Sequence, residues 1–469
     1  MTASAKPRKL SRREVLKIGG GALLGGGVLL GAAVTGCGGG GDDRPGRTAR
    51  AGQAGQADRT TVRFMTAQTR EKHRSLEPLI AEFMDIHPGI RIEHIKVPWD
   101  QAHSKYLTAI LGGAPPDVMT IPSWWVTEFR AMGALEDLGP WVRDWPHLQG
   151  YSEQVKRLTR STMAFDGDQV FGLPTEVAVR SMFYRTEWLD EHGLAPAQTR
   201  EEWRVLLEKI TDPSRQRYGY ALRGARGGFW SWWAIAQEFA GTNTWFDEDH
   251  RCVINSPDHV AGLSYWNDLY QDGLAPPDSL NWGFNELVQG FWSGLCGTME
   301  QDPEVVRTCL EHGLDENSLA ITVMPAGPRA RVALSDGGYT SMSSASPRKD
   351  EAWTFLGWLM APEQRLRYCR DVNMIPPFAD AMEDPAFGQG LYRSFVEMVT
   401  DPAILQNWYP NYLPEMGEFL EVRVTEEHQK MLLRRQSPRE TLDRLADFMT
   451  RAQRKYVDRY GPDTPRPPA

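Results

Sequence analysis

The sequence predicts an α/β protein with room for two globular domains. Strand-like and helical segments alternate in the first part of the chain and again in its middle, which is typical of a mostly parallel sheet with helical crossovers. The chain has 469 residues, of which 41% are hydrophobic and 10% are aromatic. Because a single hydrophobic core stops growing at about 250–300 residues, this length favours two domains.

The alternation can be followed element by element from the first apolar run of the folded region. Residues 61–65 predict a strand, and helical spacing at 76–85 predicts a helix that ends before His87-Pro88-Gly89. Residues 90–95 alternate strictly between apolar and polar side chains, as a half-buried strand does. The remaining predicted elements are a helix at 105–111, a strand at 117–120 and long helical segments at 351–370 and 415–456.

The N-terminus carries two motifs of protein export. Arg12 and Arg13, followed by a weakly apolar and glycine-rich stretch, resemble a twin-arginine export signal. Val34-Thr35-Gly36-Cys37 closes that stretch and resembles a bacterial lipobox, whose cysteine is acylated. The glycines make the stretch too weakly apolar for a spanning helix, which needs about 20 strongly apolar residues. We therefore expect residues 1–36 to be a cleaved signal peptide and Cys37 to anchor the mature protein outside the cytoplasmic membrane.

Composition and charge indicate unstructured segments at both ends of the folded region and limit the kinds of partner that the protein can bind. Residues 37–59 contain almost no bulky apolar side chain and are predicted to form a flexible tether, and 457–469 are predicted to be a disordered tail. The formal net charge is -9, and the leader holds a surplus of five positive charges, so the mature chain is near -14 (-9 minus 5). This charge argues against a nucleic-acid partner.

Four cysteines lie beyond the lipobox, none in a C-x-x-C pair, which argues against a zinc site and leaves disulfide pairing open. They are Cys252, Cys296, Cys309 and Cys369.

Five short motifs, in order along the chain, resemble those of one protein family. They are Pro115-Pro116-Asp117-Val118 with 131–138, Val170-Phe171-Gly172-Leu173-Pro174 with 182–189, Ile254-Asn255-Ser256-Pro257 with 266–269, Phe291-Trp292-Ser293-Gly294 with Met299, and Gly337-Gly338-Tyr339 with 346–356. The chain resembles the solute-binding lipoproteins of ABC importers, within the extracellular sugar-binding family that includes maltodextrin-binding protein. The resemblance covers about residues 61–449.

The resemblance implies an α/β, two-lobe periplasmic-binding-protein fold (type II), whose lobes are joined by strands that cross a hinge more than once. Lobe one would take 60–172 and 330–375, and lobe two would take 173–329 and 376–456. The resemblance also implies a monomer without cofactor or metal. This monomer would capture a carbohydrate, which could be a sugar, an oligosaccharide or a polyol derivative, in the cleft between the lobes and deliver it to the permease subunits of an ABC importer.

A sugar site needs aromatic rings that stack on the C–H faces of the sugar and planar polar groups that bind its hydroxyls. Tryptophans beside glycine and serine in predicted loops fit that role better than helical ones such as Trp203 and Trp266, which are more often core. The aromatic candidates are Trp124, Trp125, Phe229, Trp230, Trp232, Trp233 and Trp282. The other candidates, at strand ends or near the predicted hinge, are Gln68, Ser123, Glu176, Glu300, Gly338, Tyr339 and Asn373.

Other functions stay open at the level of sequence. A secreted glycoside hydrolase needs two carboxylates about 5–9 Å apart, which Glu176 with Glu300 or Asp302 could supply. However, the chain contains no H-E-x-x-H, G-x-S-x-G or P-loop signature. A sensing lipoprotein of the same fold is a further alternative. The ligand is open as well, because Arg223 and Arg226 beside the aromatic segment leave room for an acidic or phosphorylated sugar.

Overall fold

The computed structural model describes residues 59–68, 70–162, 164–166, 169–382 and 384–465. The predicted signal peptide with Arg12 and Arg13, the predicted lipidation site Cys37 and the tether up to residue 58 lie outside the described residues. No helix within the described ranges combines the length and the apolar character that crossing a bilayer requires. The four cysteines in these ranges are buried free thiols.

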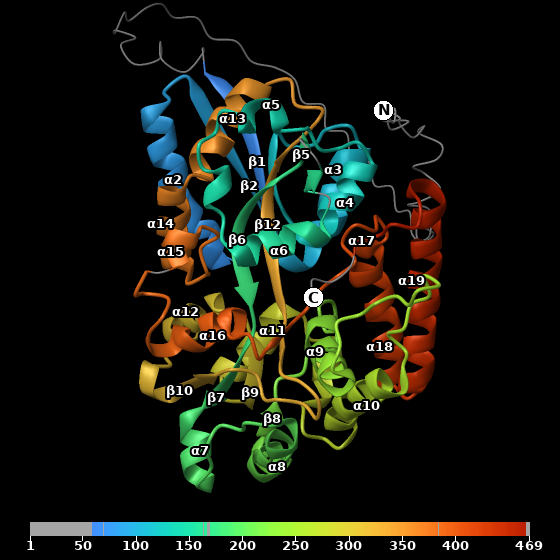
Figure 1. Cartoon of the computed structure of the whole chain (residues 1–469). Coiled ribbons are helices and arrows are strands. Elements are labelled where there is room, and N and C mark those ends of the chain that lie inside the picture. Colours follow the sequence, from blue (N-terminus) through green and yellow to red (C-terminus); the bar gives the residue numbers. More distant parts are fainter. Residues whose placement is uncertain (1–58, 69, 163, 167–168, 383, 466–469) are drawn as a thin grey trace, which may run out of the picture. The chain divides into compact units, whose positions relative to one another are not determined.

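A five-stranded sheet organises the first lobe (Figure 1). In spatial order its strands are β2 (Ile90–Pro98), β1 (Thr60–Gln68), β3 (Val118–Pro122), β12 (Ser335–Met342) and β6 (Leu173–Val179). β1 and β3 are parallel, but β12 runs antiparallel to β3 on one side and to β6 on the other. The sheet is therefore mixed rather than mostly parallel, because β12 enters it from the opposite direction.

Helices cover both faces of this sheet. They are α2 (Arg70–Ile86), α3 (Ala102–Leu111), α4 (Ser123–Ala131), α5 (Gly139–Val142), α6 (Glu153–Ser161), α13 (Lys349–Leu359), α14 (Pro362–Val372) and α15 (Ala379–Met382). The single helical segment predicted at 351–370 is thus two helices, because Pro362 occupies the first position of α14 and starts a new helix. α14 ends at Asn373, whose φ of 59° is the left-handed conformation typical of a helix end.

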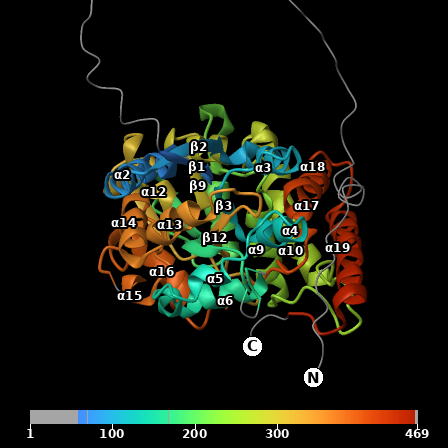
Figure 2. The same ribbon diagram turned by 90° about the horizontal axis from the view of Figure 1, so that it is seen from above.

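Successive side chains of β1 point to opposite faces of the sheet, and each face has its own core. Val62 and Phe64 pack into a cluster with residues of α2, α13 and α14. Met65 and Ala67 belong to the larger cluster on the other face, which includes residues of α3 and α4. Figure 2, seen from above, shows these two groups of helices on either side of the strands.

A four-stranded sheet organises the second lobe. In spatial order its strands are β10 (Leu319–Thr322), β7 (Ser181–Arg185), β9 (Cys296–Gln301) and β8 (Tyr218–Tyr220). β7 is antiparallel to both of its neighbours, and β8 is parallel to β9. Two short pairs complete the strands of the described residues: β4 (Phe165–Asp166) with β5 (Gln169–Val170), and β11 (Val332–Ala333) with β13 (Leu405–Gln406).

The remaining helices surround the second sheet and form the C-terminal segment. They are α7 (Thr186–His192), α8 (Arg200–Ile210), α9 (Phe229–Ala240), α10 (Pro257–Gln271), α11 (Phe284–Trp292), α12 (Glu304–Glu311), α16 (Arg393–Thr400), α17 (Met416–Glu418), α18 (Val424–Leu432) and α19 (Pro438–Tyr460). The helical segment predicted at 415–456 is interrupted. A π-helical turn at Phe419–Arg423 links α17 to α18, and a capping box of Ser437 and Glu440 starts α19 as a separate helix.

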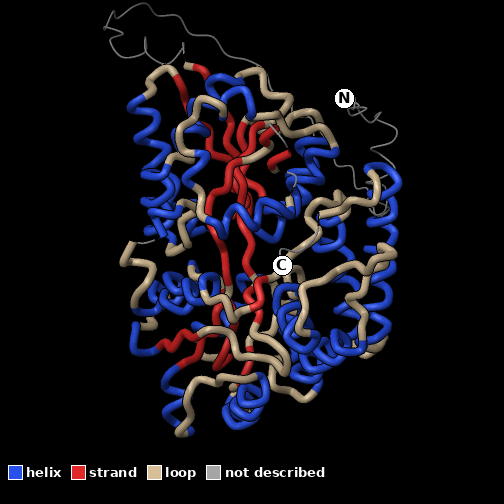
Figure 3. The backbone as a smooth tube through the Cα atoms, viewed as in Figure 1, coloured by secondary structure: helices blue, strands red, loops and turns tan. Residues whose placement is uncertain are grey.

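Two strand connections join the lobes. β6 of the first sheet continues through Arg180 into β7 of the second, and β11 leads into β12. Figure 3 shows these strands running from one sheet towards the other. The predicted lobe limits at 172, 329 and 375 stay predictions, but the pairing of β6 places Leu173–Val179 in the first sheet, so that the first crossing falls at Arg180.

In the second lobe, α9 and α10 approach each other closely at a glycine of α10. A Cβ atom built on Gly262 of α10 would lie 2.6 Å from the Cα atom of Ala236 and 2.7 Å from the carbonyl oxygen of Ile235, both in α9. Backbone atoms cannot move aside as the end of a long side chain can. Gly262 is therefore required by the approach of the two helices.

We expect Gly262→Ala to lower the free energy of unfolding by about 1 kcal/mol or more, because overpacking costs about 1–3 kcal/mol. Helix propensity alone would favour alanine by about 1 kcal/mol, so that any net loss reports packing. Gly89→Ala is the matched control, since a Cβ atom there meets no atom within 4 Å. Chemical denaturation of both variants measures the difference, and equal stability would contradict the packing argument.

Candidate functional site

Residues of both lobes line a cavity of about 110 Å³. On the side of the first lobe it lies at the ends of β1 and β3 and beside β6 and β12, and on the side of the second lobe beside α9, α11 and α12. Strand ends are where ligands bind in α/β proteins. The lining residues are Ala67, Lys72, Trp99, Thr120, Ile121, Pro122, Trp124, Glu176, Ala178, Arg180, Arg223, Trp230, Phe284, Asp302, Glu304, Asp336, Gly337 and Gly338.

Aromatic rings from both lobes form one part of the lining. Trp124 in α4 and Trp230 in α9 have ring centroids 4.9 Å apart, inclined by 45°. Trp99 meets Trp124 edge-on, with 6.2 Å between the ring centroids. Trp124 and Trp230 are 4% and 8% exposed, so each keeps a small surface at the cavity.

One buried carboxylate orients these rings. Glu421, in the π-helical turn, accepts hydrogen bonds from the indole N–H of Trp124 at 3.0 Å and of Trp125 at 3.1 Å. It also pairs with Arg226, which follows β8 and donates to the carbonyl oxygen of Trp99 at 2.8 Å. Burial alone would raise the pKa of Glu421, but Arg226 and the indole donors outweigh it and lower that pKa. Glu421 therefore stays ionised.

Charged groups form the other part of the lining. The Nζ atom of Lys72 in α2 lies 2.6 Å from a carboxylate oxygen of Glu304 in α12 and 3.5 Å from one of Glu176 in β6. Burial would lower the pKa of Lys72, but these two carboxylates raise it well above its usual value. The Nε atom of Arg180 lies 3.9 Å from Asp302. This part of the cavity can therefore offer both donors and acceptors to a polar ligand.

Another carboxylate of the cavity lining is that of Asp336. Burial, reinforced by the nearby charge of Asp302, raises its pKa to about 7, although Arg180 and Lys72 oppose the shift and Glu176 adds to it. Near neutral pH this group therefore changes between a proton donor and an acceptor.

Gly338 is required by the structure of the sheet itself. A Cβ atom at this position would lie 2.5 Å from the side-chain oxygen of Thr175 in β6. The pairing of β12 with β6 shifts its register between Gly337 and Tyr339, at the same place. The bare backbone thus allows β6 and β12 to meet closely beside the cavity.

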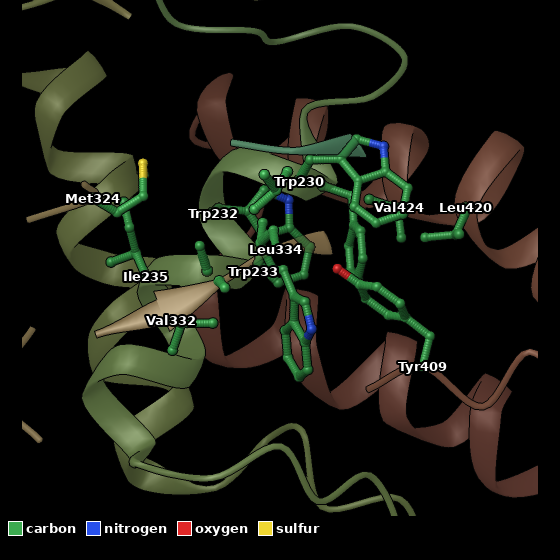
Figure 4. Close-up of a cluster of buried hydrophobic side chains, with 14 of the residues drawn as sticks. Trp230, Trp232, Trp233, Ile235, Met324, Val332, Leu334, Tyr409, Leu420 and Val424 are labelled. Atoms are coloured by element: carbon green, nitrogen blue, oxygen red, sulfur yellow. The ribbon is translucent and has the colours of Figure 1, made fainter. Parts of the chain in front are cut away.

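Four of the residues predicted from the sequence line the cavity: Trp124, Glu176, Trp230 and Gly338. Four aromatic candidates are buried behind it. Trp125, Phe229, Trp232 and Trp233 are at most 1% exposed, and Figure 4 shows Trp232 and Trp233 within a cluster of apolar side chains. The sequence left a loop or a helix start open for the segment at 229–233, and the segment forms the first turns of α9, which is buried on nearly all sides.

The other candidates whose side chains the structure describes also lie outside the cavity lining. Glu300 is buried and accepts a hydrogen bond of 2.6 Å from Tyr220, and Ser123 accepts one of 3.2 Å from Asn411. Tyr339 is buried in the first sheet, and the Trp282 ring packs against Gly290. Asn373 ends α14, and Gln68 ends β1 with a side chain outside the described residues.

Several residues that shape the site were not predicted from the sequence, notably Lys72, Trp99, Asp336 and Glu421. Each acts through contacts with residues far away in the chain. A composition signal existed only for Trp99, as one more tryptophan after a predicted strand. Within the described residues, no group of three or more His, Cys, Asp or Glu side chains could hold a metal ion.

Comparison with known proteins places this geometry in context. Residues 66–366 match the family model described as bacterial extracellular solute-binding protein. A maltotriose-binding protein of Pyrococcus abyssi is 22% identical over 333 residues, which are 68% of this chain and 69% of that protein.

Solved structures share the fold. The GacH receptor of Streptomyces glaucescens, determined unliganded and with acarbose, has a TM-score of 0.73 at 19% identity, over 84% of this chain and 99% of that one. A solute-binding protein of an ABC transporter from Thermotoga lettingae, bound with α-D-tagatose, has a TM-score of 0.75 at 18% identity, over the same shares of the two chains. The two-lobe fold expected from the sequence is thereby confirmed.

The titration of Asp336 gives a testable pH dependence. Its pKa in the folded protein, about 7, is above the unfolded value of about 3.9, so the folded state binds the proton more tightly. The wild type should lose stability relative to Asp336→Asn as pH rises from about 4 to about 7, and no further above that. Each unit of pKa difference is worth about 1.4 kcal/mol, so the change should exceed about 1 kcal/mol.

Urea denaturation of both proteins at pH 4.5, 6 and 8 measures this difference. Asp137, a carboxylate outside the cavity lining whose oxygens accept hydrogen bonds from the backbone N–H groups of Gly139 and Val170, offers a control variant, Asp137→Asn. A stability difference between wild type and Asp336→Asn that stays constant across these pH values would contradict the assignment.

Proposed function

This chain belongs to the family of bacterial extracellular solute-binding proteins, and from that premise we propose that it captures a carbohydrate between its two lobes and delivers it to the permease subunits of an ABC importer. The single observation that carries the ligand class is the pairing of aromatic and planar polar groups around one cavity. Trp124 and Trp230 supply the rings, and Glu176, Arg180 and Asp302 supply the planar polar groups.

This combination suits a sugar. Aromatic rings attract its C–H faces, and ion-paired carboxylates and guanidinium groups are held in fixed positions to bind its hydroxyls. Each aromatic contact adds only about 0.5–1.5 kcal/mol beyond the buried area, which suits a protein that must release its cargo. The relatives named above for maltotriose, acarbose and tagatose support the same ligand class.

The export motifs extend the proposal to the place of action. Arg12 and Arg13 would direct the precursor to twin-arginine export, and Cys37 would hold the mature protein, as a monomer, on the outer side of the cytoplasmic membrane. The predicted tether would keep the folded part near the permease while leaving it free to turn.

A thermal-shift screen of mono-, di- and oligosaccharides and of sugar acids with the 59–469 fragment tests the proposal. A ligand at 100 times its dissociation constant should stabilise the protein by about 2.7 kcal/mol. We expect no hydrolysis of the bound sugar. Sustained turnover that Glu176→Gln abolishes would instead support a glycoside hydrolase, and no response to any carbohydrate would refute the ligand class.

The role of Trp230 can be separated from that of its neighbours by a matched pair of variants. Trp230→Leu should weaken the binding of whichever sugar the screen identifies by about tenfold, or 1.4 kcal/mol, because the stacking surface is lost. Trp233→Leu, on the same helix but fully buried, should lower stability and leave affinity unchanged. If calorimetry finds the same affinity for the sugar in Trp230→Leu as in Trp233→Leu, the Trp230 ring only packs in the core and does not bind the sugar.

Anchoring is tested in the native host. We expect the mature protein to carry an acylated Cys37 at its N-terminus and to sediment with membranes, whereas Cys37→Ser should leave unlipidated precursor or release soluble protein. Mass spectrometry of the N-terminal peptide reads the modification directly. An unmodified Cys37 in mature wild-type protein would be incompatible with this part of the proposal.

A further inference from the structure

Arg223 lines the cavity with its hydrogen-bonding edge unoccupied. It follows β8, is 2% exposed, and its Nε and Nη2 atoms have no hydrogen-bond partner among the described residues. The nearest carboxylate, that of Asp100, lies 3.6 Å from Nη2 and is shared with Arg226 at 3.7 Å. Both distances exceed those of a good charged hydrogen bond, about 2.7–2.9 Å.

A second buried arginine shows what such an edge normally binds. Arg200, 3% exposed, donates from Nε and Nη2 to the two carboxylate oxygens of Glu238, at 2.7 and 3.0 Å. This side-on fork is the preferred geometry of arginine with a carboxylate. Arg223 presents the same two atoms at the same degree of burial, but no carboxylate of the protein occupies them.

The local backbone holds Arg223 in this position. Gly227 has a φ of 88°, and a Cβ atom there would overlap the guanidinium group of Arg223. The N–H group of Gly224 donates to Ser279 at 2.9 Å, and the carbonyl oxygen of Gly224 lies 2.8 Å from a ring nitrogen of His428. Hydrogen bonds and close packing thus hold the backbone that follows Arg223 in place.

The charge of Arg223 is poorly compensated. Burial, together with the charges of Arg180 and Arg226, lowers its pKa to about 9, although Asp100 and Asp302 oppose the shift. Among the other carboxylates of the cavity, those of Glu304 and Glu176 pair with Lys72, and that of Asp302 lies 3.9 Å from Arg180. A buried charge without a close partner destabilises a protein, and a ligand anion would relieve that cost.

We propose that the ligand is a carbohydrate bearing a carboxylate, a sugar acid of the uronate type, and that Arg223 binds this carboxylate through Nε and Nη2. The inference rests on the proposed function, because it names the class of carbohydrate that the same cavity takes. Arg223 and Asp100 belong to different lobes, so their long contact loosens when the lobes separate and a ligand enters. The sugar ring then lies against Trp124 and Trp230.

A first test needs no ligand. Arg223→Met removes a buried charge that has no close partner, and it should leave the thermal midpoint of the free protein unchanged or raise it. Arg200→Met, the matched control, strands the carboxylate of Glu238 and should lower the midpoint by several degrees. A drop in Arg223→Met as large as in Arg200→Met would show that Arg223 serves the fold and would overturn the proposal.

A second test compares matched ligands by calorimetry. D-glucuronate, D-galacturonate and a digalacturonate are paired with D-glucose, D-galactose and galactobiose, and glucose 6-phosphate is a separate arm. We expect at least one uronate to bind at least tenfold more tightly than its neutral partner. Arg223→Met should abolish that advantage without affecting the affinity for the neutral sugar.

The outcomes separate the two levels of the proposal. A neutral sugar that binds at least as tightly as its uronate, with an affinity that Arg223→Met does not change, overturns the inference and leaves the proposed function standing. Binding of the sugar phosphate without binding of any uronate overturns the carboxylate assignment. Failure of every carbohydrate to bind overturns the proposed function together with the inference.

Discussion

The site depends on the insertion of β12 between β3 and β6. Without this strand the first sheet would have no contact between its first strands and the strand that leads into the second lobe. β12 comes from the second lobe through β11, so the same residues that complete the sheet also form a connection between the lobes. Its first residues place Asp336 and Gly337 in the cavity wall, where they pair with Ala178 and Val177 of β6. The hinge and the binding surface are therefore built from the same backbone, and a change in one moves the other.

The C-terminal segment adds a further link between the lobes. α17 packs against α4 of the first lobe, and α18 and α19 pack against α10 of the second. Glu421 lies between them and holds Trp124 on one side and Arg226 on the other. The surface ion pairs between the lobes, such as Arg74 with Glu311 and Arg307 with Asp371, contribute only about 0–1 kcal/mol each. The buried carboxylate therefore has more influence on how the aromatic part of the cavity is assembled.

The sequence predicted the early strands and helices because their signals are local: strict alternation, helical spacing and a terminating proline. Trp124 and Trp230 were predicted by residue type and line the cavity. Their neighbour Trp233 was also predicted, but it lies in the core. A helix that is buried on nearly all sides has no polar face, so its pattern does not tell which tryptophan meets the cavity. Asp336 and Glu421 could not be predicted, because their roles arise from contacts with residues far away in the chain, such as Arg180 for Asp336 and Trp124 for Glu421.

The cavity shows two ways of burying charge. Around Lys72 one ammonium group lies within reach of two carboxylates, those of Glu304 and Glu176, and these contacts orient the side chains. Around Arg223 the compensation is incomplete, although the same chain forms a full side-on pair at Arg200. This fold can therefore pair a buried arginine closely with a carboxylate. The lack of such a close pair at Arg223 is a property of the site rather than of the whole protein. Stability alone would favour an apolar side chain or a close carboxylate at that position. Arg223 gains a close partner only when an anionic ligand binds. A ligand without the anion leaves the charge of Arg223 incompletely compensated, so that the site selects for the anionic ligand.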